Sequence, residues 1–134
     1  MLFDRFNLSE NIFDILFATE QQKLVGKLLI MYIKDNESEI TKTEMSFFAT
    51  QLHEGKYVFH GSIIGIQANK VKLKYNKRQF YDRILTPLRS MGLIDYDMYK
   101  KTYKTSENFN KEMTRIGLIW LKELRKPILN LKKK

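Results

Sequence analysis

Apolar residues recur at helical spacing in the first half of the chain and predict two long helices. The first spans about residues 20–35, and its apolar positions are Leu24, Val25, Leu28, Leu29, Tyr32 and Ile33. The second begins near Thr41 and stops near Gly55, with an inward face of Met45, Phe48, Ala49 and Leu52. Capping boxes precede both helices, at Thr19 with Gln22 and at Thr41 with Glu44. A shorter helix with Ser9 as its N-cap is expected before them.

Residues 77–91 form another helical pattern, apolar on one side and polar on the other. The apolar stripe consists of Phe80, Ile84, Leu88 and Met91, widened by Tyr81 and Leu85. The opposite side carries Arg78, Gln79, Asp82, Arg83, Thr86, Arg89 and Ser90. Pro87 lacks a backbone donor and clashes with the preceding turn, so we expect a kink or a restart at Thr86–Pro87. Gly92 is the expected left-handed cap.

Strands and a last helix complete the predicted elements. Residues 56–76 are read as an extended pair, because "KVKLKY" alternates Val71, Leu73 and Tyr75 with Lys70, Lys72 and Lys74. Residues 93–114 predict a hairpin with its polar tip near Lys104 to Asn108. Residues 114–131 predict a helix that Pro127 bends or ends, with Ile116, Trp120, Leu121, Leu124, Ile128 and Leu131 as its apolar positions. The fold class that follows is α+β, mostly α, in a single domain over residues 1–134.

Charge and composition narrow the range of partners. The chain has 134 residues, 43% of them hydrophobic, and a formal net charge of +9 with no cysteine. Residues 100–134 alone carry eleven basic and three acidic side chains, which favours a polyanionic partner over a merely solvated surface. No secretory signal is visible, and the most apolar run, "KLVGKLLIMYIK", is too short to span a bilayer. We expect a cytoplasmic protein with no membrane partner and no cofactor.

Two short motifs resemble those of winged-helix DNA-binding proteins, such as the MarR-like and PadR-like transcriptional regulators of archaea and bacteria. In that superfamily a recognition helix ends in a Leu-rich pattern followed by "GLI", and "LRSMGLI" matches at Leu88, Gly92, Leu93 and Ile94. A hairpin wing then closes on a Leu-Thr-x-x-Gly pattern that starts the last helix. "MTRIG" matches it with Met113, Thr114 and Gly117. The resemblance covers about residues 41–131, but residues 56–76 stand where the family has a short turn.

The resemblance implies N-terminal helices over 1–36, a helix-turn-helix core over 41–114 with an inserted segment 56–76 and a wing 93–114, and a C-terminal helix over 114–131. It implies a regulator of transcription that binds double-stranded DNA, with helix 77–91 in the major groove and a basic wing on the backbone. The DNA-binding residues would be Lys77, Arg78, Gln79, Asp82, Arg83, Thr86, Lys100, Lys101 and Lys104. Lys70, Lys72 and Lys74 would extend the backbone contacts. By analogy with related regulators, the first and last helices would form a homodimer.

Other classes of function stay open. One is a winged helix that binds protein within a replication or transcription assembly, and RNA is a further candidate ligand. Another is a metal-dependent nuclease that uses Glu54 and Lys56 of "HEGK". Catalytic and metal sites are otherwise not expected, because His53 and His60 are the only histidines and no third ligand is suitably spaced. Asp95 and Asp97 fall on one side of a predicted strand, where such acidic pairs are usually solvated.

Overall fold

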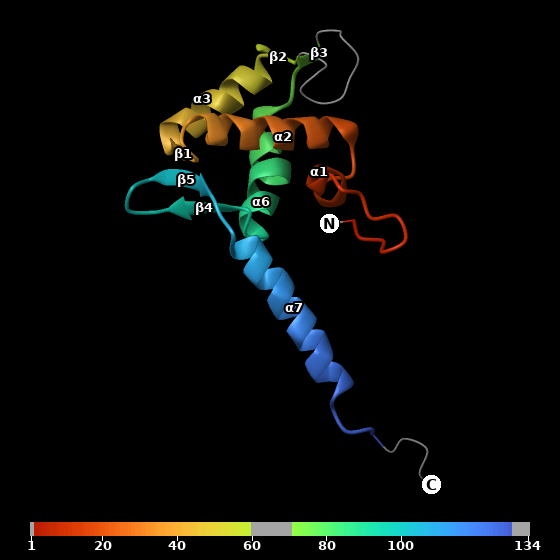
Figure 1. Ribbon diagram of the computed structural model, residues 1–134. Coiled ribbons are helices and arrows are strands. Elements are labelled where there is room, and N and C mark those ends of the chain that lie inside the picture. Colours follow the sequence, from red (N-terminus) through yellow and green to blue (C-terminus); the bar gives the residue numbers. More distant parts are fainter. Residues whose placement is uncertain (1, 60–70, 130–134) are drawn as a thin grey trace.

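The fold is α+β and mostly helical. The computed structural model describes residues 2–59 and 71–129 (Figure 1). The elements in chain order are α1 (Ile12–Leu16), α2 (Glu20–Asp35), β1 (Glu39–Thr41), α3 (Lys42–His53), β2 (Tyr57–Phe59), β3 (Val71–Leu73), α5 (Lys77–Phe80), η1 (Tyr81–Leu85), α6 (Thr86–Ser90), β4 (Ile94–Asp97), β5 (Thr102–Thr105) and α7 (Asn108–Leu124). We call the run α5–η1–α6, residues 77–90, the central helix.

Five strands form two small antiparallel sheets among the described residues. The larger has the order β1-β5-β4, so the hairpin β4–β5 pairs back onto the strand that follows α2. We call this hairpin and its turn, residues 94–105, the wing. The smaller sheet pairs β2 with β3, which confirms the extended pair expected on either side of residues 60–70. This order of helices, strands and hairpin is compatible with a winged-helix layout.

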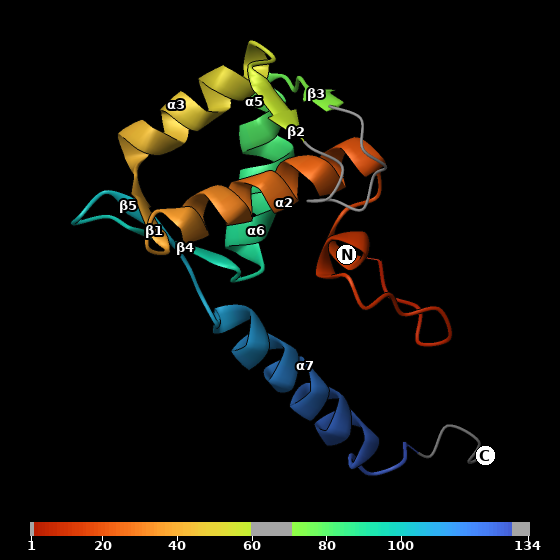
Figure 2. The same cartoon turned by 45° about the horizontal axis from the view of Figure 1, so that its top comes forward.

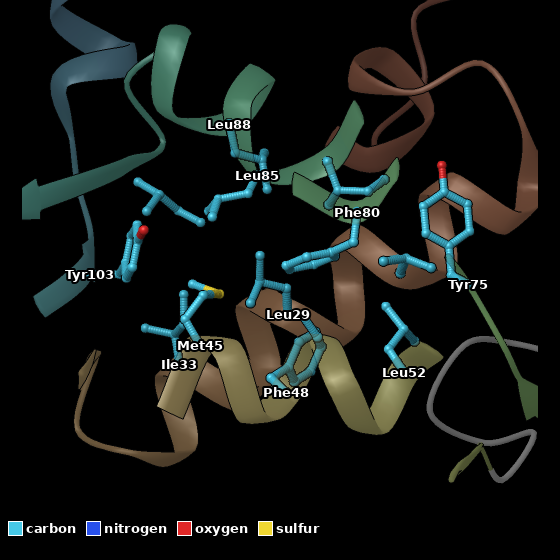
Figure 3. Packing of buried hydrophobic residues seen from close by; sticks show 14 of the residues in the cluster. Leu29, Ile33, Met45, Phe48, Leu52, Tyr75, Phe80, Leu85, Leu88 and Tyr103 are labelled. Atoms are coloured by element: carbon cyan, nitrogen blue, oxygen red, sulfur yellow. The ribbon is translucent and has the colours of Figure 1, made fainter. Parts of the chain in front are cut away.

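The core lies where α2, α3 and the central helix meet (Figure 3). The predicted inward face of α3 is confirmed, because Met45, Phe48, Ala49 and Leu52 are all buried. Phe80, Ile84, Leu85 and Leu88 are buried on the central helix, and Val25, Leu29 and Ile33 on α2. Phe48 lies at the centre, with ring centroids 5.1 Å from Tyr32 and 5.5 Å from Phe80. Tyr103 brings the wing into the same cluster.

Helix starts follow the sequence closely, with one exception. Thr41 and Glu44 form the complete capping box, and Thr19 accepts a hydrogen bond from the Gln22 N–H. Ser9 was expected to cap the first helix, but the N-cap is Asn11. The Ser9 hydroxyl instead accepts from the Asn11 N–H at 3.0 Å and donates to Asp14 at 2.8 Å. Both residues are good caps, and the hydroxyl braces the turn before the helix.

Pro87 does not restart the central helix, so the restart expected at Thr86–Pro87 is wrong. Thr86 has helical backbone angles of −58° and −48° and does not act as an N-cap. The turn before it widens into a π-helix over Tyr81–Leu85, in which the Thr86 N–H donates to the Tyr81 carbonyl. A π-turn changes the positions of the carbonyls that a proline ring would otherwise meet. The helix therefore passes through Pro87 and ends at Ser90, before Gly92 with its φ of +83°.

The wing and the last helix lie earlier in the sequence than predicted. The polar tip was expected near Lys104 to Asn108, but Lys104 lies within β5 and the turn spans residues 98–101. The Asp97 carboxylate closes that turn by accepting from the N–H groups of Tyr99 and Lys100, at 2.9 and 3.0 Å. α7 consequently starts at Asn108 rather than 114, and it ends at Leu124, ahead of Pro127.

The helix α7 extends away from the rest of the molecule in both views (Figures 1 and 2). It has 17 residues and none of them is buried. Its start is fixed to the body, because the Phe109 N–H donates to the Gly92 carbonyl at 2.9 Å and the Phe109 ring packs against the core. Met113, Thr114 and Gly117, which carry the second motif of the resemblance, lie in its second and third turns rather than at its start.

Candidate nucleic-acid interface

The outer face of the central helix is open to solvent. Five of the side chains predicted to contact DNA are exposed along it: Arg78, Gln79, Asp82, Arg83 and Thr86. Their exposure follows from the burial of Phe80 and Ile84 on the opposite side. The nearest ionic contact joins Arg78 Nε to Asp82 Oδ2 at 3.9 Å, with the side chains 92% and 66% exposed. An exposed pair of this kind contributes little to stability, so both groups are free to meet a ligand.

Lys77 differs from the other residues predicted on this helix because its side chain has partners on α3. Its ammonium donates to the hydroxyls of Thr50 and Ser46 on α3, at 2.9 and 3.3 Å. Its backbone N–H donates to His53 Nδ1 at 3.0 Å. The Asn76 side chain accepts from the Gln79 N–H and so caps the helix. Lys77 and His53 therefore join α3 to the start of the central helix.

The tip of the wing presents both basic and apolar side chains. Lys100 and Lys101 are exposed there, and Lys101 has a φ of +56° in the turn that Asp97 closes. Lys104 is exposed on β5, opposite Glu39 and Asp95 in the sheet. Met98 and Tyr99 are 77% and 99% exposed at the same tip. The sequence analysis did not single out these two residues, although apolar residues beside a turn-forming Asp in "DMYKK" could have indicated them.

Arg89 joins the central helix to the wing, and it was not among the predicted contacts. Its guanidinium lies over the rings of Tyr96 and Tyr103, 5.3 and 5.8 Å from their centroids. The two rings are themselves 4.6 Å apart. Burial raises the pKa of Tyr103, and the charge of Arg89 opposes that rise. Beside this stack lies an open hollow of about 390 Å³ lined by Thr86, Arg89, Ser90, Ile94, Asp95 and Tyr96.

The structure describes only some of the three lysines that were expected to extend the contacts with the DNA backbone. Lys74 is exposed, and its carbonyl accepts from the Gln21 side chain at 2.8 Å. Lys70 lies outside the described residues, and of Lys72 only the backbone is described. Leu73 and Tyr75 are buried as the alternation predicted. Of these three lysines, only Lys74 has a side chain that the structure describes, and it is exposed.

Residues considered for catalysis have structural partners. Glu54 Oε1 and Lys56 Nζ form an exposed ion pair at 3.1 Å, and His53 accepts from the Lys77 N–H. Asp95 accepts from the Asn108 side chain at 2.9 Å. Across residues 2–59 and 71–129 no group of three or more His, Cys, Asp or Glu side chains is placed to hold a metal ion. His60 lies outside that part of the chain.

Comparisons with protein-family models, with curated proteins and with solved structures found no match to this chain. Within the part of the chain that the structure describes, no helix combines the length and apolar character needed to cross a membrane.

Proposed function

We propose that the protein binds double-stranded DNA, with the outer face of the central helix in the major groove and the wing on the adjacent backbone. The observation that carries the proposal is the junction at Arg89. This side chain comes from the helix and stacks on the wing, so the two surfaces are continuous through Thr86, Arg89 and Tyr96. A helix alone would offer one polar face, whereas this arrangement offers a helix and a basic hairpin side by side.

The exposed side chains suit the edges of bases in the major groove. The guanidinium groups of Arg78 and Arg83 can pair with guanine, and the Gln79 amide with adenine. Asp82 can accept from the amino group of cytosine, and Thr86 can touch a thymine methyl group or a phosphate. On the wing, Lys100 and Lys101 supply positive charge for phosphates. Met98 and Tyr99 add apolar groups of the kind that enter a minor groove.

A salt titration with three arginine or lysine variants tests the proposal. Arg83→Ala should weaken a site selected from a random duplex pool by about 1–3 kcal/mol. Lys101→Ala should weaken all sequences alike and lower the slope of log affinity against log salt by about 0.9. Arg5→Ala is the matched control, because Arg5 is exposed in the N-terminal segment and stacks on Phe6. No binding to random duplex at low salt would remove the proposal altogether.

A protein-binding role remains the second candidate, and one observation favours it. Phe47 is 57% exposed on α3, where it borders an open hollow of about 460 Å³ with Lys42, Thr43, Ser46 and Thr50. An exposed aromatic ring with a polar rim is common at protein interfaces. If DNA does not bind, Phe47→Ser in a partner-capture assay becomes the informative variant. The nuclease alternative has no such support in the described residues, since Glu54 and Lys56 neutralise each other.

The expected regulator of transcription, its cytoplasmic location and its homodimer belong to the same proposal. The absence of cysteine suits a reducing compartment. For the homodimer, the two ends of the chain differ. α1 packs on α2, and its Leu16 and the neighbouring Phe17 belong to the core of a single copy. In α7, by contrast, no residue is buried. Only the C-terminal part of the expected dimer interface therefore gains support.

A further inference from the structure

The apolar face of α7 is uncovered beyond its first turn, where Phe109 packs against the core. The fractions of the side chains exposed there are 55% for Ile116, 60% for Trp120, 42% for Leu121 and 59% for Leu124. Met113 lies on the same face. All five positions fall within one side of the helix. Leu118 and Ile119, 60% and 57% exposed, lie on the flanks of this stripe, together with the ion pairs of Arg115 and Lys126. A contiguous exposed apolar stripe of this size normally marks an interaction site.

Gly117 lies within this face, and no neighbour in the described part of the chain requires a glycine there. Glycine is less favourable in a helix interior than any residue except proline. The other two glycines that can be compared have clear reasons. A Cβ on Gly26 would lie 2.6 Å from the buried Phe17 ring, and Gly92 has a φ of +83°. At Gly117 nothing lies within 4 Å of an added Cβ. The missing side chain leaves a notch that opens outward, one turn away from Trp120.

We propose that a second copy of this chain covers α7 by pairing with it antiparallel, so that Trp120 of each copy fills the notch at Gly117 of the other. Antiparallel helices bring residues together in opposite order. When Trp120 lies level with Gly117 of the partner, Met113 lies level with Leu124 and Ile116 with Leu121. Every apolar position of the face then meets an apolar position. In a parallel pair the two Trp120 rings would clash with each other. The two Gly117 positions would face each other and leave a void beside the rings.

The apolar area that α7 can bury decides how much of the helix must take part in the pairing. α7 has 17 residues and is therefore about 26 Å long. Seven apolar side chains of the stripe and of the segment just after the helix are available for pairing: Met113, Ile116, Trp120, Leu121, Leu124, Ile128 and Leu129. If each loses on the order of 70 Å² on pairing, two copies bury about 1,000 Å², the lower limit for a specific interface. Pairing over the full length meets that limit, whereas a crossing at one point would not.

The charges beside the stripe favour a second copy over an anionic membrane. Glu112 and Glu123 border the stripe on the side of Ile116 and Trp120. They form ion pairs with Arg115 in the helix and with Lys126 just after its end. A helix lying on an anionic surface places basic residues at that border. Here carboxylates would face the headgroups, whereas in a helix pair they stay at the solvated edge.

Cysteine cross-linking tests the pairing, because the chain has no cysteine of its own. The variants Met113→Cys and Leu124→Cys are prepared separately and then mixed, without DNA. Antiparallel pairing predicts a disulfide-linked dimer in the mixture. It predicts none with either variant alone, because position 113 of one copy lies about 16 Å along the axis from position 113 of the other, and a disulfide needs Cβ atoms about 4 Å apart. Linked dimers from each variant alone would instead establish a parallel pair and overturn the proposal.

Exchanging the residues at positions 117 and 120 provides a second test that does not rely on cross-linking. Gly117→Trp alone sets two indole rings against each other and should raise the dimer dissociation constant at least tenfold by sedimentation equilibrium. The double variant Gly117→Trp/Trp120→Gly restores a ring opposite a notch and should return the constant to within about threefold of the original. Circular dichroism should show an unchanged body in each variant, since neither position touches it.

Two results would overturn the proposal. One is a chain that remains monomeric at about 100 μM. If that monomer binds phosphatidylserine vesicles through Trp120, the apolar face of α7 is a membrane-binding surface. The other is a dimer that tolerates Gly117→Trp and therefore uses a different surface. DNA binding is measured separately, so loss of the dimer and loss of the proposed DNA function are distinguishable.

Discussion

Removing Arg89 should separate two contributions of this residue to the proposed DNA-binding surface: its stacking on the wing and its charge. The guanidinium lies over two tyrosine rings, at 5.3 and 5.8 Å from their centroids. At an exposed site such a contact stabilises by about 0.5–1 kcal/mol, so Arg89→Ala should lower the free energy of unfolding by no more than about 1 kcal/mol. In the proposed DNA complex the same change removes one cation at the junction of helix and wing. If Arg89 contacts a phosphate, the salt slope should fall by about 0.9.

The conservative variant makes the assay decisive. Arg89→Lys keeps the charge but loses the planar group that stacks on the rings. It should therefore retain most of the salt slope while losing the stacking contribution to stability. Anisotropy titrations at several salt concentrations and urea unfolding are measured for both variants. An Arg89→Ala protein that keeps the full slope, while Lys101→Ala lowers it, would show that the junction lies outside the contact surface.

Three further changes have effects that the structure determines. Thr41→Ala removes half of the capping box of α3 and should cost about 1 kcal/mol in urea unfolding. Phe48→Ala empties the centre of the core, where the side chain is 0% exposed, and should cost about 3–5 kcal/mol. The pKa of Asp97 is lowered from 3.8 by the N–H groups of Lys100 and Tyr99. Its support of the wing turn is therefore complete above pH 3.8 and lost as the pH falls towards the folded value. Asp97→Asn should keep the turn but remove this pH dependence, as measured by amide exchange at Tyr99.

Local signals predicted the body of the protein well. The stripes of α2, α3 and the central helix bury the residues that helical spacing indicated, because each stripe meets another within the same chain. The capping box at Thr41 and the left-handed positions Gly55 and Gly92 also hold, since each depends on interactions a few residues apart. The same spacing placed Arg78, Gln79, Asp82 and Arg83 on the exposed side.

The errors arise where neighbouring signals compete. Ser9 and Asn11 are both good caps, and the sequence does not show which will be used. The polar run at residues 104–108 looked like a turn, but Asp97 closes the chain earlier by binding two backbone N–H groups. Pro87 was expected to kink or restart its helix, but a π-turn precedes it, and that turn contains the buried Ile84 and Leu85. None of these outcomes follows from periodicity alone.

The position of α7 shows why its partner could not be predicted from its pattern. An apolar stripe indicates that a helix face will be covered, but not whether the same chain covers it. Here the connection between the central helix and α7 decides where α7 lies. The left-handed Gly92 brings Phe109 to the end of the central helix, where the Phe109 N–H donates to the Gly92 carbonyl. A Cβ on Gly92 would lie 2.8 Å from the Phe109 nitrogen, so this close approach requires glycine. It directs α7 outward and away from the core. The residue that ends the proposed DNA-reading helix thus also sets the direction of the proposed dimer helix. A second copy bound along α7 would hold two of the proposed DNA-binding surfaces in a fixed relation.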